Sequence, residues 1–281
     1  MRVPGLIDII TVRDPAALRA MAADPRLDRP QTGRGPLLNR LIARLARDTL
    51  KADNHLLPSG RAHDDHRRHD LRAALSARLS APGLETALDG PVRDAAVYVA
   101  GGAGDPLRLA QGLLGPVLID GFTPSDDTVA AAATIGRPLS GGTGQQVLDW
   151  LTGRSRRARK LLYGAANGDL NAVHAIGIAA QNLAASLDAM RAAGLATPAA
   201  KMLAHAMIAP KTVLRQGTAP AETLGGSVRA GTLVLLSVED ATRRTLDPRV
   251  AFLRDAWSGC PAHGFVPALL RRIWTEAGGA S

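Results

Sequence analysis

The stretch "VLRQGTAPAETLGGSVRAGTLVLLSVEDATRRTLDPRVAF", residues 213–252, differs in character from the rest of the chain. It contains Gly-Gly and Ala-Gly steps, followed by the apolar run "TLVLLSV" at 232–238. Glycine pairs mark turns, and runs rich in β-branched residues favour strands. We therefore expect a turn and a short hairpin over 222–241, in a chain that otherwise has helical patterns.

The longest helical pattern precedes this stretch, in "DLNAVHAIGIAAQNLAASLDAMRAAG" (169–194). It is rich in Ala, Ile and Leu nearly all round, which predicts a central, buried helix. Asp169 or Asn171 can cap its start, and Gly194 can end it. A shorter helix is expected over 197–210, because a Thr-Pro step opens it.

Further helices are predicted on both sides. Apolar residues recur at helical spacing in 35–52, and "HDLRAALSARLS" (69–80) is stopped by Ala-Pro-Gly. A terminal helix, "VPALLRRIWTEA" (266–277), has a proline near its start. We see no repeat and no linker. The sequence therefore predicts one domain over residues 1–281, mainly α with a small β hairpin or sheet.

Cys260, in "DAWSGCPAHGF" (255–265), is the only cysteine of the chain. A single cysteine excludes an intramolecular disulfide and fits a reducing compartment. Three roles are open: a small core residue, a nucleophile paired with His263, or a metal ligand. The loop carries glycine and proline and precedes a helix, where backbone N–H groups and the helix dipole favour a thiolate.

The composition limits the classes of molecule that the protein is expected to bind. The net charge is +9, and nearly all of the positive charge is arginine, because lysine occurs only four times. Aromatic residues make up 3%, too few for a base-stacking platform, so we expect no nucleic acid. A basic surface favours an acidic electron-transfer protein or an anionic cofactor. No apolar run could span a bilayer, and the N-terminus does not resemble a signal peptide, so we expect no membrane and a cytoplasmic protein.

The run "HDDHRRHD" (63–70) contains six residues of metal-ligating types. A metal site built on it would suit a metal-dependent hydrolase. Two other interpretations stay open: a solvated helix start with acids in its first turn, or a group of residues beside an anionic cofactor.

The order of elements resembles the C-terminal half of a cytochrome P450. Residues 213–252 look like the family segment that runs from the haem-propionate arginine through a hairpin to an Asn-Arg-Asp-Pro motif. Arg215 matches that arginine, 241–248 matches the motif with two extra residues, and Cys260 matches the axial thiolate. The resemblance is clearest over 213–275 and weaker over 63–212.

The resemblance implies an abbreviated cytochrome P450-like single domain with haem b, its iron held by the thiolate of Cys260. Residues 63–88 are similar to the early helix of the family that contributes propionate contacts. The implied cofactor-binding residues are Arg215, His63, His66, Arg67, Arg72 and Trp257. The central helix of the family passes over the haem, which makes Gln181 and Asn182 the candidate catalytic residues.

The sequence also departs from the family pattern. Residues 197–210 contain no Glu-x-x-Arg pair, and the acid–alcohol pair that relays protons aligns with Asn182 and Leu183. Leu183 cannot relay a proton and Asn182 is not an acid. The resemblance thus implies a haem-thiolate oxidoreductase, monooxygenase-like and acting on a small organic substrate, that uses peroxide or catalyses a non-standard oxidation or rearrangement. A haem-free scaffold or partner protein and the hydrolase at 63–70 stay open as alternatives.

Overall fold

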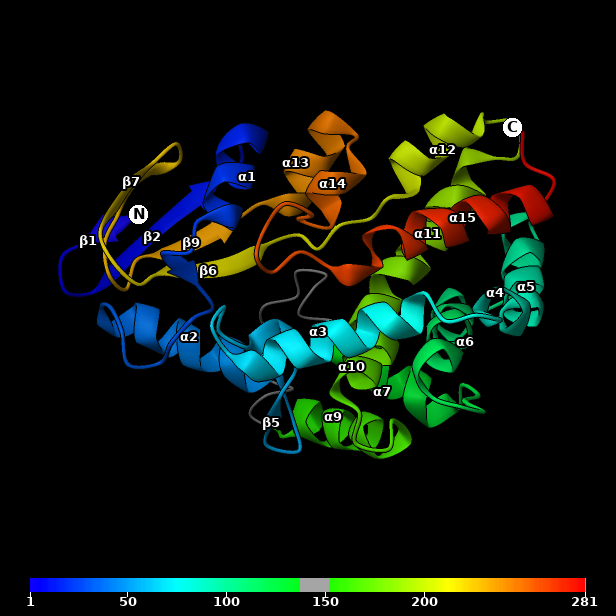
Figure 1. Ribbon diagram of the computed structural model, residues 1–281, viewed down its shortest axis with the longest axis horizontal. Coiled ribbons are helices and arrows are strands. Elements are labelled where there is room, and N and C mark those ends of the chain that lie inside the picture. Colours follow the sequence, from blue (N-terminus) through cyan, green and yellow to red (C-terminus); the bar gives the residue numbers. More distant parts are fainter. Residues whose placement is uncertain (137–151, 281) are drawn as a thin grey trace. The chain divides into compact units, whose positions relative to one another are not determined.

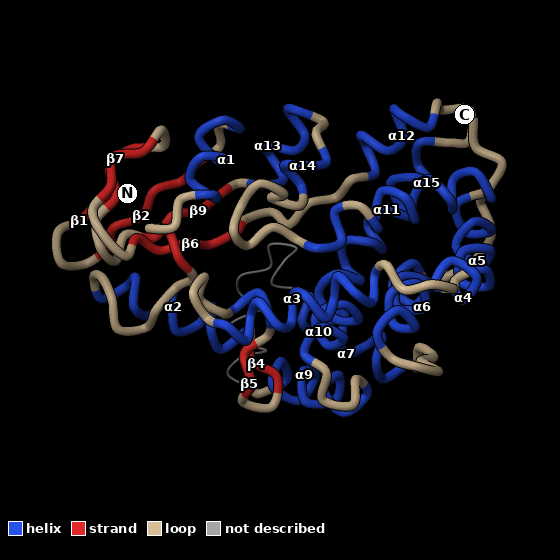
Figure 2. Tube along the Cα trace, in the orientation of Figure 1, coloured by secondary structure: helices blue, strands red, loops and turns tan. Residues whose placement is uncertain are grey.

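The computed structural model describes residues 1–136 and 152–280, and the chain divides into two units (Figure 1). The sheet unit comprises Met1–Lys51, Ser59–His69 and Ala209–Cys260. The helical unit comprises Ala52–Pro58, Asp70–Ile208 and Pro261–Ser281. Figure 2 shows most of the strands in the sheet unit. Helices far outnumber strands in the described residues, so the predicted class is confirmed, whereas a single domain over 1–281 stays a prediction.

A five-stranded sheet in the order β1-β2-β9-β6-β3 organises the sheet unit. Its strands are β1 (Arg2–Val3), β2 (Ile7–Val12), β3 (Leu27–Asp28), β6 (Val213–Gly217) and β9 (Leu233–Leu236). Two short pairs are β4 (Lys51–Ala52) with β5 (His55–Leu56), and β7 (Ala221–Thr223) with β8 (Gly226–Val228). Strand β9 runs parallel to β2 and antiparallel to β6, so the sheet joins the two ends of the unit's sequence.

The hairpin expected over 222–241 is present as β7 and β8. The apolar run after it forms β9, whose partners β2 and β6 lie outside the hairpin. Leu233, Val234 and Leu236 are fully buried, which fits a central strand covered on both faces. The sequence did not predict β2, because its partner lies near the other end of the chain.

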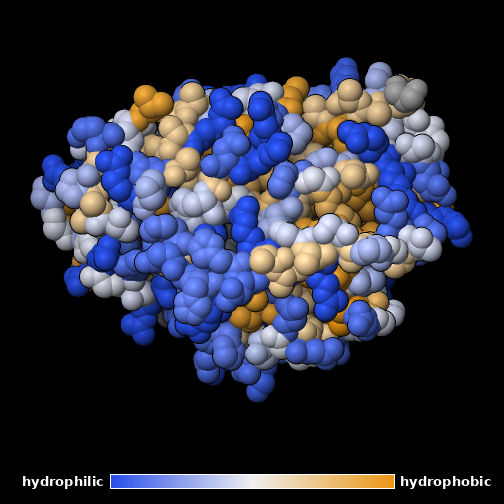
Figure 3. Space-filling view, in the orientation of Figure 1, coloured by the Kyte–Doolittle hydropathy of each residue, from blue (hydrophilic) through white to orange (hydrophobic). Residues whose placement is uncertain are grey.

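Helices cover both sides of this sheet. They are α1 (Pro15–Ala23), α2 (Leu37–Thr49), α13 (Val238–Thr245) and α14 (Pro248–Ala251). Figure 1 shows α1 and α13 on one side of the strands and α2 on the other. Figure 3 shows mostly hydrophilic side chains over this part of the sheet unit, although Leu37 and Leu41 of α2 are also exposed.

Asn39 fixes α2 against the sheet. Its Nδ2 donates to the carbonyls of Asp8 (2.7 Å) and Gly231 (2.8 Å), and its Oδ1 accepts from the Asp8 N–H (3.1 Å). The backbones approach closely at Gly35 and Gly231, both of which have a φ of +86°. Neither residue therefore has room for a Cβ. The position of α2 therefore depends on one buried amide and two glycines.

Helix α3 (His66–Leu79) begins in the sheet unit and continues into the helical unit. Short 3₁₀ turns are η1 (Pro58–Gly60) and η4 (Pro261–His263). The helical unit contains α4 (Leu84–Ala87), α5 (Asp89–Val99), α6 (Pro106–Leu118), α7 (Asp126–Gly136), α9 (Arg154–Ala165), α10 (Leu170–His174), the π-helical turn η3 (Ala175–Ala179), α11 (Ala180–Ala193), α12 (Ala199–Ala206) and α15 (Phe265–Glu276). None of the helices in residues 1–136 and 152–280 has both the length and the apolar character of a membrane span.

The long helix predicted over 169–194 is confirmed as α10, η3 and α11, which follow one another without a break. The Asp169 carboxylate caps its start by accepting from the N–H groups of Asn171 and Ala172, and Gly194 ends it at φ +74°. Ile176 and Leu187 are fully buried, so this helix is central to the helical unit, as expected.

A π-helical turn interrupts this helix and leaves the carbonyl of Ile176 available to another element. The fully buried Gln111 of α6 donates to that carbonyl (2.9 Å) and to the carbonyl of Thr128 (3.0 Å). Gln111 Oε1 in turn accepts from the Thr128 hydroxyl (3.0 Å). One glutamine therefore joins α6, α7 and the central helix at the place where the helix changes its pitch.

Candidate functional site

Three arginines surround the indole ring of Trp257 in the sheet unit. The guanidinium carbons of Arg68, Arg215 and Arg29 lie 4.9, 5.1 and 5.6 Å from its centroid. His63 approaches the same ring edge-on at 5.6 Å. We call Arg29, Arg68 and Arg215 the arginine cluster. A cation over an indole face is favourable, but three cations around one ring repel one another.

Separate segments of the chain bring these residues together. Arg215 lies in the middle of β6, opposite Val234 of β9, and is fully buried. Arg29 follows β3, which pairs with β6, and Arg68 lies in the first turn of α3. The sheet therefore places Arg29 beside Arg215 although they are distant in sequence.

Backbone carbonyls and one hydroxyl satisfy part of the cluster. Arg68 donates to the carbonyls of Trp257 (2.9 Å) and His63 (3.1 Å). Arg215 donates to the Leu214 carbonyl (3.1 Å) and to the Ser258 hydroxyl. The acceptors of Arg215 within the described residues are neutral, so they hold its guanidinium group in place without offsetting its charge.

A nearby acid, Asp28, offsets the charge only in part. Asp28 is buried and accepts from the N–H groups of Arg29 (2.6 Å) and His63 (3.0 Å). Burial, and then the charge of Arg68, lowers the pKa of Arg29 to about 10. Burial, and then the charge of Arg29, lowers the pKa of Arg215. Both shifts show that the protein alone disfavours the charged forms.

Several buried nitrogens of this site have no hydrogen-bond partner within the described residues. They are Arg29 Nε, Arg215 Nε, His63 Nδ1 and Trp257 Nε1. His63 Nδ1 lies 3.6 Å from Asp28 Oδ2, which is too far for a hydrogen bond. Buried donors without acceptors are costly, and here they coincide with excess positive charge. The site is therefore suited to an anionic group such as a carboxylate.

The net positive charge of the chain is concentrated in the sheet unit. The sheet unit has 20 arginines and lysines against 12 acidic residues, whereas the helical unit has 14 against 13. Almost all of the net charge of +9 therefore belongs to the unit that holds the arginine cluster.

The loop between α14 and Cys260 ends the sheet unit. Its backbone is folded tightly, because a Cβ on Gly259 would lie 2.5 Å from the carbonyl oxygen of Leu253 and 2.9 Å from that of Arg254. The N–H of Cys260 donates to the Phe252 carbonyl (2.9 Å), and the residue is partly exposed. Ser258, two residues earlier, accepts the hydrogen bond of Arg215.

The structure separates the candidates that the sequence predicted for this region. Arg215, His63 and Trp257 lie together, whereas His66 and Arg67 are exposed on the first turn of α3. Arg67 faces Asp65 at 3.8 Å. Arg72 belongs to the helical unit, and its predicted role is untested.

Sequence reasoning missed Arg29 and Arg68. Arg68 is buried, although the preceding residue, Arg67, is exposed. The helical spacing of the run could have indicated that these two neighbours lie on different faces of the helix. Arg29 has no such signal, because strand pairing alone brings it to the site.

Only part of the run 63–70 forms a possible metal site. Ligand atoms of His63 and Asp64 lie within 4.8 Å of one another and of Asp28. His66 and His69 are exposed and do not belong to this group in the described part of the chain. The surrounding arginines oppose a bound cation, so the geometry favours an anion here.

The remaining candidates, Gln181 and Asn182, lie in the first turn of α11 directly after the π-helical turn, and both are half-buried. The side chain of Gln181 packs against Gly136 of α7, where a Cβ would overlap it. Its Nε2 is buried and has no hydrogen-bond partner in the described residues. A single buried amide donor in this position can orient a small polar group.

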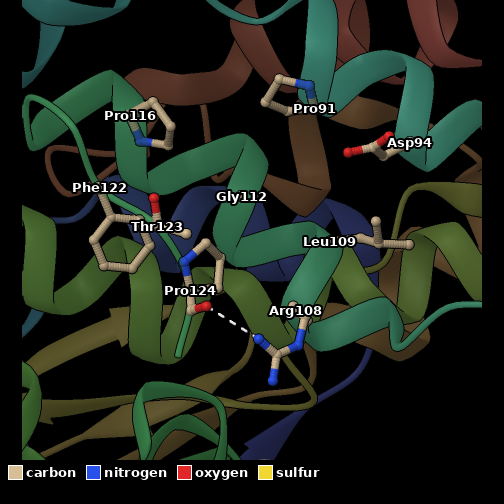
Figure 4. Close-up of a pocket in the computed structure, with 9 residues that line it drawn as sticks. All are labelled: Pro91, Asp94, Arg108, Leu109, Gly112, Pro116, Phe122, Thr123 and Pro124. Atoms are coloured by element: carbon tan, nitrogen blue, oxygen red, sulfur yellow. Dashed lines mark hydrogen bonds between the residues drawn. The ribbon is translucent and has the colours of Figure 1, made fainter. Parts of the chain in front are cut away.

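A cavity of about 380 Å³ lies within the helical unit, between α5 and α6 (Figure 4). Apolar side chains form much of its wall, and Pro116 lies one turn after Gly112 in α6. Arg108 at its edge donates to the Pro124 carbonyl (3.0 Å) and also pairs with Asp126. This cavity contains none of the residues predicted from the sequence.

No family model and no curated protein sequence matches this chain. Solved structures do match. They include CYP175A1 from Thermus thermophilus (TM-score 0.60, 16% identity, 98% of this chain and 82% of that one). A 6-coordinated cytochrome P450, also from Thermus thermophilus, has a TM-score of 0.59 and 16% identity, over 95% of this chain and 83% of that one.

A third match is the Mycobacterium marinum cytochrome P450 CYP268A2 in complex with pseudoionone. Its TM-score is 0.56 and its identity 19%, over 98% of this chain and 81% of the other. At identities this low, the structural similarity shows the fold alone. The fold that the resemblance implies, clearest over 213–275 and weaker over 63–212, is thus confirmed, and this chain has the cytochrome P450 fold.

Proposed function

We propose that this chain is a haem-thiolate oxidoreductase of the cytochrome P450 type that acts on a small organic substrate. Its fold supports the proposal, and the solved relative in complex with pseudoionone is a cytochrome P450 with a small organic molecule bound. The observation that carries the proposal is the arginine cluster, with its excess charge and with buried donors that lack acceptors in the described residues.

The residues of the sheet unit fit the carboxylates of a haem. Arg215 and Arg68 would supply charge-assisted hydrogen bonds to the propionates, with His63 and the indole N–H of Trp257 as further donors. Binding would supply acceptors for Arg215 Nε, His63 Nδ1 and Trp257 Nε1. Cys260 would ligate the iron as a thiolate, and the haem we propose is haem b, as the family resemblance implies.

A haem bound through a thiolate supplies iron that can oxidise an organic substrate. The chain's own contribution is positioning. Arg215 ties β6 to Ser258, and so holds the loop that ends at Cys260. Gln181, with its buried amide donor, and Asn182 would orient a polar group of the substrate or oxidant.

The residues in place of the acid–alcohol pair argue for a reaction that needs no proton relay. Neither Asn182 nor Leu183 can transfer a proton as a carboxylic acid does. We therefore infer that the chain uses peroxide, or catalyses a rearrangement or another non-standard oxidation. If reduction is needed, the charge of the sheet unit favours an acidic electron-transfer protein.

The test is a haemin titration of the purified protein, followed by visible absorption spectra. We expect stoichiometric uptake, a Soret band, and a thiolate-specific band when the reduced protein binds carbon monoxide. Cys260→Ala should abolish the thiolate band, while Cys260→His should move the Soret band to the position typical of imidazole ligation.

A protein that takes up no haemin would overturn the proposal. The scaffold alternative would then predict a stable complex with another protein. The hydrolase alternative would predict a stoichiometric divalent metal that is lost in His63→Ala, and metal analysis separates the two.

A further inference from the structure

A cavity of about 400 Å³ in the sheet unit has two arginines in its lining. It is lined by Arg29, Gln31, Thr32, Gly33, Arg47 and Ala62. None of these six residues is acidic. Its two charged residues come from different elements, because Arg29 follows β3 and Arg47 lies in the last turn of α2.

The nearest acids in the sequence already have partners, and Asp28 offsets the charge of Arg29 only in part. Asp28 accepts from the N–H groups of Arg29 and His63, and Asp48 pairs with Lys51 at 3.1 Å. Arg47 donates one hydrogen bond to the Pro30 carbonyl (3.3 Å), and the Nε of Arg29 is buried without an acceptor among the described residues. The cavity thus has two guanidinium groups whose donors are only partly used.

The wall of the cavity is held in place before any ligand binds. Gln216 of β6 is almost fully buried and accepts from the Gln31 N–H (2.8 Å). Its amide nitrogen donates to the Arg34 carbonyl (3.2 Å), so one side chain fixes both ends of the segment 31–34. Because the wall is already ordered, binding of a ligand there costs less conformational entropy.

We propose that this cavity binds the anionic group, a phosphate or a carboxylate, of a small molecule, between the guanidinium groups of Arg29 and Arg47. Paired guanidinium groups suit both oxyanions, because each can donate two parallel hydrogen bonds. The volume lies in the range of small-molecule sites and exceeds that of the oxyanion alone.

The site is distinct from the proposed haem contacts. Arg47, Gln31 and Ala62 take no part in the arginine cluster, which involves the cavity only through Arg29. An anion here would offset the charge of Arg29 and so reduce its repulsion of Arg68. The proposal does not depend on haem binding.

The test uses the full haem-free chain, titrated calorimetrically with inorganic phosphate and, separately, with acetate, at an ionic strength held constant with chloride. Saturable binding of at least one probe is expected, and the stronger of the two identifies the chemistry of the natural ligand. Arg47→Gln should weaken binding at least 10-fold, by roughly the 1.4 kcal/mol that corresponds to that factor. Arg44→Gln, on an exposed site of the same helix, should leave it unchanged.

Arg47→Lys keeps the charge and should retain more of the affinity than Arg47→Gln, provided that far-ultraviolet circular dichroism shows both variants folded. Absence of saturable binding, or equal affinity in Arg47→Gln and Arg44→Gln, would overturn the inference. Haemin uptake by the same variants keeps the two proposals apart. Uptake in Arg47→Gln equal to wild type, with phosphate binding lost, supports a separate site, whereas anion binding in a protein that rejects haemin would refute the haem proposal alone.

Discussion

Arg215 donates a hydrogen bond to the hydroxyl of Ser258, and this contact joins the centre of the sheet to the loop that ends at Cys260. The guanidinium is fully buried, and its hydrogen-bond acceptors in the described residues are a carbonyl and a hydroxyl, not a carboxylate. It therefore has two opposite effects. It orders the cysteine loop, and it leaves inside the protein a charge that Asp28 offsets only in part and that a bound anion would offset further.

Replacement of Arg215 by methionine should separate these effects. Haemin affinity should fall about 10- to 150-fold, because a charge-assisted hydrogen bond contributes roughly 1.5–3 kcal/mol. The haem-free protein should be no less stable than wild type, because an apolar side chain of similar length removes an uncompensated charge. Haemin titration and urea unfolding measure the two quantities.

Arg67→Met is the matched control for this pair of measurements. The family resemblance assigns Arg67 to the cofactor, but the structure exposes it on α3. It should bind haemin as wild type does. Equal losses in Arg215→Met and Arg67→Met would show that total charge, and not the arginine cluster, controls uptake.

Gly259→Ala should disturb the cysteine loop directly. A Cβ there would meet the carbonyl oxygens of Leu253 and Arg254 at 2.5 and 2.9 Å, and these belong to backbone that cannot move independently. We expect a loss of about 1–3 kcal/mol in the free energy of unfolding, with a weakened thiolate band. Gly264→Ala, where nothing lies within 4 Å of the added Cβ, should leave the spectrum unchanged. A normal thiolate band in Gly259→Ala would mean that the loop adapts more readily than its packing indicates.

Gln111→Leu should destabilise the central helix at its π-helical turn. The carbonyls of Ile176 and Thr128 would lose their buried donor, at a cost of about 2–4 kcal/mol in urea unfolding. Gln181→Leu on α11 is the comparison, since its Nε2 makes no hydrogen bond in the described residues and its removal should cost less. A larger loss in Gln181→Leu than in Gln111→Leu would contradict this account of the turn.

The sequence was most informative where a feature depends on local residues. The helix over 169–194 begins at Asp169 and ends at Gly194 as its composition predicts. Its π-helical turn was not predicted, because it depends on Gln111, some 65 residues away. The run 232–238 was recognised as strand-forming, but its pairing with β2 was not, since no local pattern specifies a partner at the other end of the chain.

The candidate site shows the same division. Arg215, His63 and Trp257 were found through resemblance to a known family, and they lie together. Within the run 63–70 the resemblance could not fix the register, so it proposed the exposed Arg67 in place of the buried Arg68. Arg29 could not be found, because its proximity to Arg215 results from the pairing of β3 with β6.

Arg29 also makes the stability of the haem-free protein depend on pH in a predictable direction. Its pKa is about 10 in the folded chain, and in the unfolded chain it returns to its higher, ordinary value. Below pH 10 both states carry the proton, so the folded state bears the full cost of the buried charge. Between these values the unfolded chain binds more protons, and the folded state gains stability as the pH rises.

Arg29→Met removes the group that titrates. In protein dialysed free of phosphate, the variant should be more stable than wild type by about 1–3 kcal/mol at about pH 7 to 9, and this difference should shrink above about pH 10. Urea unfolding of both proteins over this range measures the difference, and other groups that titrate there cancel between them. A variant less stable than wild type near pH ~8, or a difference that grows with pH, would show that Arg29 is compensated within the fold. Arg29 belongs to the arginine cluster and also lines the cavity that contains Arg47. That result would therefore remove the reason to expect a bound anion at either place.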